Sequence, residues 1–334
     1  MAKKNISYEE TYLVTHSTIN SLRSSVISMG FKEILPCIIS KKYEPGAKHS
    51  IAILGNKELP NILKNDSSVA AIGKEAYYLP VSHVVEKQMS LQFLQKAFCV
   101  APCLRLLMDG EEKSGKHIYN FFQFEIEWRT ESMEEVFLTA NKILNKTAEI
   151  LLSDNDIISI LNKKNIPFKN LESLSTLQFP IVSFREAQKL VGKSTNCNQD
   201  FTQDEDTILS NNFNSPFWIF DYPAGVRDSI YHENEKGTFD TYDLMLPFGF
   251  GELTTGGIRP QSKEEIVKQS ITLGKSYYPA YADWKETSKV QTAGFGIGIE
   301  RFMRFITDSN SILNFVQYHD DGPNKNICES FFEN

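Results

Sequence analysis

The sequence lacks the features that direct a protein to a membrane or to the cell exterior. It contains no run of about eighteen apolar residues, so we expect no membrane-spanning helix. Residues 1–5 are basic, but no apolar stretch follows them, so they do not resemble a secretory signal peptide. The five cysteines form an odd set, which is typical of reduced thiols rather than of a disulfide framework. We therefore expect a cytoplasmic protein without a membrane partner.

An excess of positive charge is also absent. The chain has 35 Lys and Arg residues against 42 Asp and Glu residues, which gives a net charge of −7. A protein that grips a nucleic-acid backbone typically carries a basic stripe, so the composition does not favour RNA binding, although an acidic protein can keep positive charge in a local patch. No internal repeat or low-complexity run divides the sequence, and we expect residues 1–334 to form a single domain.

Cysteine spacing gives no metal-binding motif. Cys99 and Cys103 lie four positions apart, and no His or Cys pair is near them in the sequence. Zinc sites are usually marked by such pairs, so the sequence predicts no zinc site.

A glycine-rich segment is the most informative feature that is present. Residues 293–302 place glycine at every second position and then continue with Glu300 and Arg301. Alternating glycines leave one face of a strand bare, so that a flat or charged ligand can lie against the backbone. Arg301 opens the following helix and offers a fixed cation to a phosphate group. Without other evidence, the same pattern is equally typical of a bulge or a tight packing site.

Residues 104–128 indicate a strand, a loop and a second strand. Arg105 ends the first strand, and the polar residues 108–115 form the loop. On the second strand Glu125 and Glu127 alternate with apolar residues, which predicts one wet face and one face in the core.

These segments resemble the motifs of class II aminoacyl-tRNA synthetases. Residues 104–128 are similar to motif 2, residues 293–302 to motif 3, and Gly30–Pro36, after a helix expected over Leu13–Met29, to motif 1. Residues 220–229, 242–247 and 251–259 resemble the aspartate, asparagine and lysine subgroup, and above all its asparaginyl-tRNA synthetases. The resemblance covers residues 10 to 320 and rests on separate blocks that occur in one order.

The resemblance implies an α+β fold, in which helices flank an antiparallel sheet. Residues 138–215 would be a helical and loop insertion between motifs 2 and 3, with a helix capped by Ser183 and Glu186 and a loop or poorly ordered segment over residues 192–214. Motif 1 builds the dimer interface in this family, so we expect a homodimer. Enzymes of the subgroup also carry an N-terminal anticodon-binding barrel, but motif 1 already begins at Gly30, so we expect no anticodon-binding domain.

The resemblance also implies that ATP and Mg²⁺ take part in an adenylation reaction. The expected catalytic residues are Arg105, which would hold the α-phosphate and the substrate carboxylate, and Arg301, which would hold the γ-phosphate and stack on adenine. The expected ATP-binding residues are Lys116, His117, Phe121, Glu252 and Arg301. The expected metal ligands are Asp243, Glu252 and Thr255. An aromatic residue on a strand is also typical of a core, and a carboxylate at a strand end is also typical of a solvated surface.

Amino-acid binding is assigned by the same resemblance to Glu44, Ser82, Gln88, Glu125, Arg227 and Arg259. Arg259 would recognise the distal carboxyl or amide group, because a planar guanidinium suits such bidentate contacts. His83 and Glu86 stand where the family usually has Pro and Tyr, which indicates a reshaped pocket. The Arg-x-Glu of motif 2 reads Arg105-Leu106-Leu107 here, so a carboxylate that contacts adenine and the tRNA end is missing.

These departures favour a paralogue that uses a new acyl acceptor. We expect a ligase that adenylates an aspartate-like amino acid and transfers the acyl group to ammonia or a small amine, as synthetase-related asparagine synthetases do. The alternative is aminoacylation of tRNA or a tRNA-like acceptor. Both reactions release AMP and pyrophosphate by way of an aminoacyl-adenylate. A third interpretation, a catalytically silent regulator, is disfavoured by the retention of Arg105, Glu252 and Arg301.

Overall fold

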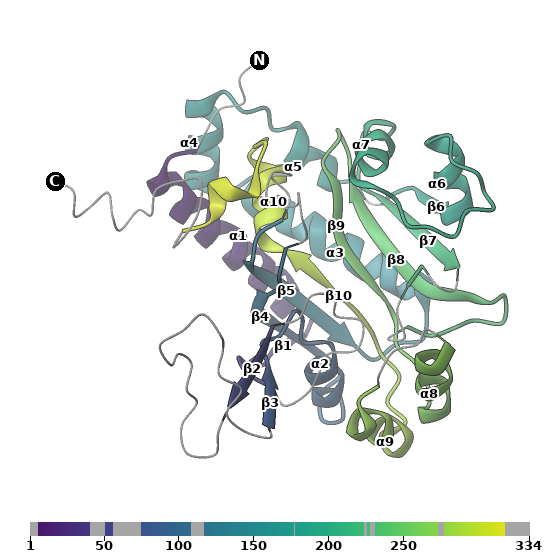
Figure 1. Cartoon of the computed structure of the whole chain (residues 1–334). Coiled ribbons are helices and arrows are strands. Elements are labelled where there is room, and N and C mark those ends of the chain that lie inside the picture. The colour runs from purple at the N-terminus through teal and green to yellow at the C-terminus, as the bar shows by residue number, and fades with distance from the viewer. Residues whose placement is uncertain are drawn as a thin grey trace, which may run out of the picture.

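The computed structural model describes residues 6–40, 51–55, 75–107, 117–176, 178–223, 226–227, 231–272 and 277–317. An eight-stranded sheet forms its centre, in the order β1-β4-β5-β10-β9-β8-β7-β6 (Figure 1). Its strands are β1 (Lys32–Glu33), β4 (Lys96–Leu104), β5 (Asn120–Trp128), β10 (Ala293–Gly298), β9 (Gly251–Ile258), β8 (Thr238–Leu246), β7 (Phe217–Pro223) and β6 (Ile181–Ser183). Neighbouring strands are antiparallel from β4 to β7, whereas β1 and β6 join the two edges in parallel. A separate hairpin pairs β2 (Ala52–Gly55) with β3 (Glu75–Tyr78).

Helices cover one face of the sheet. The helices α1 (Tyr8–Ser28) and α3 (Met133–Leu151) lie side by side behind it in Figure 1, and their apolar residues share one core cluster with the central strands. The same cluster takes in α4 (Asn155–Lys164), α5 (Lys169–Leu174), α10 (Ile299–Ile306) and a short 3-10 helix, Ile312–Phe315. The remaining helices are α2 (Val84–Ser90), α6 (Phe184–Leu190), α7 (Gln203–Asn211), α8 (Lys263–Thr272) and α9 (Pro279–Ser288). The α+β fold expected from the sequence is confirmed.

Apolar and acidic side chains alternate along β5, and the apolar ones lie on the face of the sheet that packs into the core. Phe124, Ile126 and Trp128 point toward the helices and are fully buried. Glu125 and Glu127 point to the other face, as their spacing predicts. That face is not wet, however, because both carboxylates are 1% exposed or less. The expectation of a solvated face is wrong, since buried cationic side chains cover it.

Capping residues mark the start of both α6 and α7, whereas the polar composition of residues 192–214 does not reveal the second of these helices. Ser183 and Glu186 form the expected capping box at the start of α6. The polar stretch 192–214 was expected to be a loop or a poorly ordered segment but contains α7. This helix begins at a second capping box, formed by Thr202 and Glu205, which satisfies the backbone N–H groups of the first turn despite the polar composition.

Residues 138–215 contain most of α3, then α4 to α7 and β6. The helix α3 packs against α1, and β6 pairs with β7 at the edge of the large sheet. Whether this stretch is an insertion within one domain stays a prediction. Within the described residues, none of the helices combines the length and the apolar character that crossing a membrane requires.

Candidate active site

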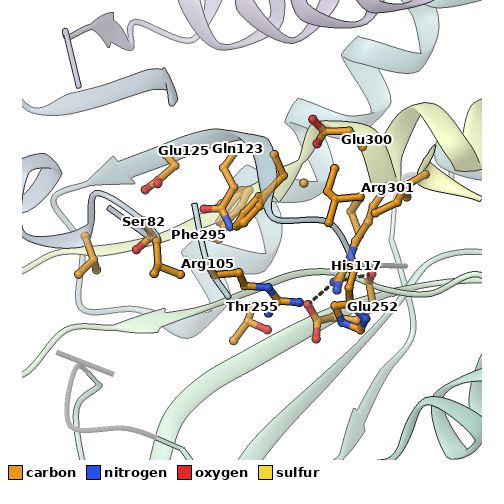
Figure 2. Close-up of a pocket in the computed structure, with 18 of the residues that line it drawn as sticks. Ser82, Arg105, His117, Gln123, Glu125, Glu252, Thr255, Phe295, Glu300 and Arg301 are labelled. Carbon is orange, nitrogen blue, oxygen red and sulfur yellow. Dashed lines mark hydrogen bonds and ion pairs between the residues drawn. The ribbon is translucent and has the colours of Figure 1, made fainter. Parts of the chain in front are cut away.

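A cavity of about 280 Å³ lies on the face of the sheet that α1 and α3 leave open. Strands β5, β9 and β10 line it, together with residues before α2, after β4 and at the start of α10. Figure 2 shows Arg301, His117 and Glu252 gathered at one end, with Arg105 beside Thr255, whereas Ser82 and Glu125 lie toward the other end. The cavity therefore has two chemically different ends. The predicted site residues that line it are Ser82, Arg105, His117, Phe121, Glu125, Glu252, Thr255, Arg259 and Arg301.

The first end brings two arginines together from distant parts of the chain. Arg301 lies in the first turn of α10, and its Nη1 is 2.8 Å from Oε1 of Glu252. Arg105 follows β4 directly, and its guanidinium lies 6.0 Å from the centre of the Phe121 ring. Burial alone would raise the pKa of Glu252, but Arg301 and Arg227 lower it, so the carboxylate is ionised at neutral pH. Arg105, Phe121 and Arg301 thus surround a space suited to an anionic ligand with a flat ring.

Glycine at position 294 is required by a close approach. A Cβ atom on Gly294 would lie 2.0 Å from Oε2 of Glu127, and one on Gly256 of the adjacent strand would lie 2.4 Å from the Gly294 carbonyl oxygen. Gly296 and Gly298 line the cavity itself. The bare face of the glycine strand is therefore confirmed, although at Gly294 a carboxylate of the protein fills the space.

The second end contains a buried ion pair. Nε and Nη2 of Arg259 donate to the two oxygens of Glu127 over 2.9 and 2.8 Å, and the hydroxyl of Thr292 donates to the same carboxylate. Both charged side chains are at least 97% buried. Among the described residues, the third nitrogen, Nη1, makes no hydrogen bond. One guanidinium nitrogen of Arg259 is therefore left over by the pair with Glu127, which balances the charge of the arginine.

Glu125 is the acidic group that lines this end. Its Oε1 accepts a hydrogen bond from the backbone N–H of His83, and Lys87 Nζ lies 2.7 Å from its Oε2. Burial opposes ionisation, but Lys87 and His83 lower the pKa of Glu125 to about 2. A carboxylate that stays ionised at the cavity wall can accept a substrate ammonium group. The sequence analysis assigned no role to Lys87 or Glu127, although their neighbours Gln88 and Glu125 were assigned.

Asp243 and Arg227 belong to a hydrogen-bond network beside the cavity, and neither of the two lines it. Oδ1 of Asp243 accepts a hydrogen bond from the Thr255 hydroxyl over 2.7 Å, and Oδ2 accepts from Tyr222 and Arg227. Arg227 also pairs with Asp200 over 3.0 Å. Burial raises the pKa of Asp243 to about 6, even though Arg227 opposes the rise. Of this network, only Thr255 lines the cavity within the described part of the chain.

Gln88 is a further predicted residue that is not part of the cavity lining within the described residues. Gln88 is buried, and its Oε1 accepts hydrogen bonds from Tyr281 and Lys285. Glu44 and Lys116 lie outside the described residues. Glu252 and Thr255 are the predicted metal ligands that reach the cavity, and their oxygens are the hard donors that suit Mg²⁺ beside phosphate.

Glu300 is a cavity residue that the sequence analysis did not select. Its two carboxyl oxygens lie 3.0 and 3.2 Å from the backbone nitrogen of Phe122, which donates to them. Burial raises the pKa of Glu300 to about 7. The signal was present in the Glu-Arg pair that ends the glycine segment, where only Arg301 received a role.

Comparison with known proteins identifies relatives of the whole fold. The family model "tRNA synthetases class II (D, K and N)" matches residues 1–321. The chain is 22% identical over 241 residues to an asparagine–tRNA ligase of Thermococcus kodakarensis, covering 69% of this chain and 54% of the relative. It is 25% identical over 262 residues to that of Desulforamulus reducens, covering 73% and 57%. The chain thus spans about half the length of these curated relatives.

Solved structures share the fold as well. Asparaginyl-tRNA synthetase from Pyrococcus horikoshii, complexed with asparaginyl-adenylate, superimposes with a TM-score of 0.77 at 19% identity, covering 93% of this chain and 68% of the other. A putative aspartyl-tRNA synthetase from Leishmania major gives a TM-score of 0.74 at 16% identity, covering 96% and 66%.

Proposed function

Since the chain belongs to the class II tRNA synthetases of the D, K and N group, we propose that it activates asparagine or aspartate with ATP and transfers the aminoacyl group to tRNA. The observation that carries this proposal is the single cavity that Arg105 and Arg301 line at one end and Glu125 and Arg259 at the other. A triphosphate needs fixed cations, and an amino acid needs an anion for its ammonium group. Both requirements are met within one cavity.

In the first step, a carboxylate oxygen of the amino acid attacks the α-phosphorus, and pyrophosphate leaves. Arg105 neutralises charge that builds on the phosphoryl oxygens, and Arg301 holds the phosphate that departs. Phe121 and Arg301 provide flat surfaces for adenine, and His117 lines the cavity beside Glu252. Mg²⁺ bound by Glu252 and Thr255 would supply additional positive charge to the phosphates.

The second step determines the class of ligase. A ribose hydroxyl of tRNA attacks the acyl carbon of the adenylate, an ester bond forms, and AMP leaves. The relatives' names support this acceptor, because they are asparagine–tRNA ligases. Ammonia or a small amine was the first expectation from the sequence, and the names of the relatives support tRNA, the alternative, in its place.

At the amino-acid end, the buried charged side chains determine which groups of the substrate can bind. Lys87 pairs with Glu125 and Arg259 pairs with Glu127, so each of these two buried cations faces a buried carboxylate before any substrate binds. The α-ammonium group would pair with Glu125, and the substrate's distal amide or carboxyl group would accept a hydrogen bond from the free Nη1 of Arg259.

The proposal is tested by measuring ATP–pyrophosphate exchange and acyl transfer separately. We expect exchange with asparagine or aspartate in RNA-free buffer, and we expect a labelled aminoacyl product only after tRNA is added. Arg301→Ala and Arg105→Ala should each slow exchange by at least about 100-fold, because each removes charge stabilisation of the transition state. Arg185→Ala, in α6 and outside the cavity lining, is the matched control and should retain the wild-type rate.

If Arg105→Ala and Arg301→Ala both catalyse ATP–pyrophosphate exchange at the wild-type rate, these two arginines do not bind the phosphates of ATP as proposed. Full AMP production with ammonia in the absence of tRNA would restore the amide-ligase interpretation, while leaving the assignment of the cavity intact.

A further inference from the structure

Three side chains with metal-binding atoms meet beside the amino-acid end of the cavity. His83 precedes α2, Cys103 lies on β4, and Glu125 lies on β5. One ligand atom from each residue lies within 4.8 Å of the others, and all three residues are buried. The sequence analysis expected no zinc site because it considered neighbours in the sequence, whereas these residues are neighbours only in the fold.

The orientation of the His83 ring is that of a metal ligand. Its Nε2 lies 2.7 Å from the carbonyl oxygen of Cys37, which can only accept, so Nε2 carries a proton. In the neutral ring, the lone pair is then on Nδ1, the atom that faces the cluster. Metal-binding histidines almost always donate their other ring N–H to a carbonyl or carboxylate in this way, because the bond fixes the tautomer and the ring orientation.

The surroundings of Nδ1 require a positive charge. Nδ1 lies 3.3 Å from Oε1 of Glu125, and Lys87 Nζ lies 2.7 Å from the other oxygen of the same carboxyl group. A lone pair that faces a carboxylate oxygen at this distance is repelled, unless a proton or a metal ion lies between the two atoms. A proton on Nδ1 is the alternative to the metal ion at this position, and the Cys103 thiol, which donates to the carbonyl oxygen of Ala101 over 3.6 Å, would lose that bond when the metal binds.

We propose that His83, Cys103 and Glu125 bind a Zn²⁺ ion at the wall of the cavity. Imidazole nitrogen, thiolate sulfur and carboxylate oxygen are the three ligand types that zinc accepts in proteins, and three protein ligands leave a fourth position for water or another small ligand. Zinc bonds of about 2.0–2.3 Å in a tetrahedral arrangement separate the ligand atoms by roughly 3.3–3.8 Å. The distance from Nδ1 to Oε1 already fits, and Cys103 needs to move by about an ångström or less.

The ion would adjoin the amino-acid end without replacing its charge pairs. Glu125 lines the cavity, whereas His83 and Cys103 are not among the residues that line it. Lys87 Nζ lies nearest to Oε2 of Glu125, so Oε1 is the oxygen on the His83 side. Binding releases the proton of the Cys103 thiol and the proton that Nδ1 of His83 directs at Glu125 when no metal is bound, so that zinc, neutral imidazole, thiolate and carboxylate together are neutral.

Cys99 provides a matched control on the same strand. It is fully buried like Cys103 and lies on β4 four residues earlier, but it is not part of the cluster.

The experiment measures metal binding by the full chain, independently of any enzymatic activity. The protein is stripped with a chelator and titrated with Zn²⁺, and with Co²⁺ as a coloured probe whose thiolate ligand produces a near-ultraviolet charge-transfer band. We expect one equivalent of Zn²⁺ per chain and the thiolate band in the wild type and in Cys99→Ala. His83→Ala and Cys103→Ala should bind at least about tenfold more weakly, and Cys103→Ala should lose the band.

Cys103→Ser is included because it keeps the size of the side chain if the alanine variant does not fold, and circular dichroism establishes which variants are folded. Absence of stoichiometric Zn²⁺ from the wild type would overturn the proposal and leave His83 as an imidazolium paired with Glu125. A thiolate band that persists in folded Cys103→Ser but is lost in Cys99→Ala would overturn it as well.

Discussion

Glu127→Gln is expected to be among the most destabilising single-atom changes in the molecule. Glu127 binds Arg259 through two hydrogen bonds, accepts a third from Thr292, and is fully buried. Replacing one oxygen by an amide nitrogen turns an acceptor into a donor opposite a guanidinium. It also leaves the Arg259 charge without its partner. Removing one partner of a buried pair costs about 3–5 kcal/mol, because the remaining charge is desolvated and uncompensated.

The loss should be measurable as a shift of the urea midpoint followed by circular dichroism, provided that the slope of the transition is unchanged. Lys263 and Asp283 form a matched control, because their 2.6 Å pair lies on the surface with both side chains about half exposed. Asp283→Asn should therefore lose less than about 1 kcal/mol.

A double variant, Glu127→Gln with Arg259→Met, separates the interaction energy of the ion pair from the other effects of each substitution on stability. It should lose clearly less than the sum of the two single variants, because it leaves no unpaired charge. If Glu127→Gln costs no more than Asp283→Asn, or if the double variant loses the full sum, the reasoning about the buried pair is refuted.

Three further predictions concern other elements. Gly294→Ala should destabilise the fold by more than about 2 kcal/mol in the same urea assay, because its Cβ would lie 2.0 Å from Glu127; Gly298→Ala, whose nearest contact would be 3.5 Å, should be nearly neutral. Burial raises the pKa of Glu300 to about 7 from 4.5, so the folded state holds a proton that the unfolded state has released. Relative to Glu300→Gln, wild-type stability should thus fall by on the order of 3 kcal/mol as the pH rises from 4.5 to 7, and parallel pH curves would contradict this. The expected homodimer stays a prediction; Leu35, 95% exposed, lies in the N-terminal segment expected to pair, so Leu35→Asp should shift light scattering from dimer to monomer, whereas a monomeric wild type would count against it.

The sequence predicted the parts of the site that follow from local periodicity. Period-2 alternation placed Glu125 and Phe124 on opposite faces of a strand, and the structure has them there. The glycine spacing predicted a strand with one bare face against which a ligand can lie, and Gly296 and Gly298 of that strand line the cavity. Such patterns depend only on residues that are close together in the sequence, so they can be recognised without knowledge of tertiary contacts.

Features that depend on distant partners could not be predicted in this way. Glu125 reads as a solvated residue in the sequence, because its cation Lys87 lies on another element and becomes a partner only in the fold. Asp243 reads as a strand-end carboxylate, but Tyr222 and Arg227 reach it from β7 and beyond. Alternation gives the direction of a side chain, whereas burial and charge partners are set by the elements that pack over it.

The position of β10 between β5 and β9 has a consequence for how the protein folds. In the register Phe295 lies opposite Ile126, although the two residues are far apart in the sequence, and β10 follows every other strand of the large sheet in chain order. During synthesis β5 and β9 leave the ribosome earlier and present unpaired inner edges until β10 arrives. Exposed edges can pair with another chain, so a nascent or refolding molecule should be most prone to aggregate in this interval. Insertion of the glycine strand closes both edges, and it also brings Arg301 to Arg105, so the molecule would gain its resistance to aggregation and its cavity in one late event.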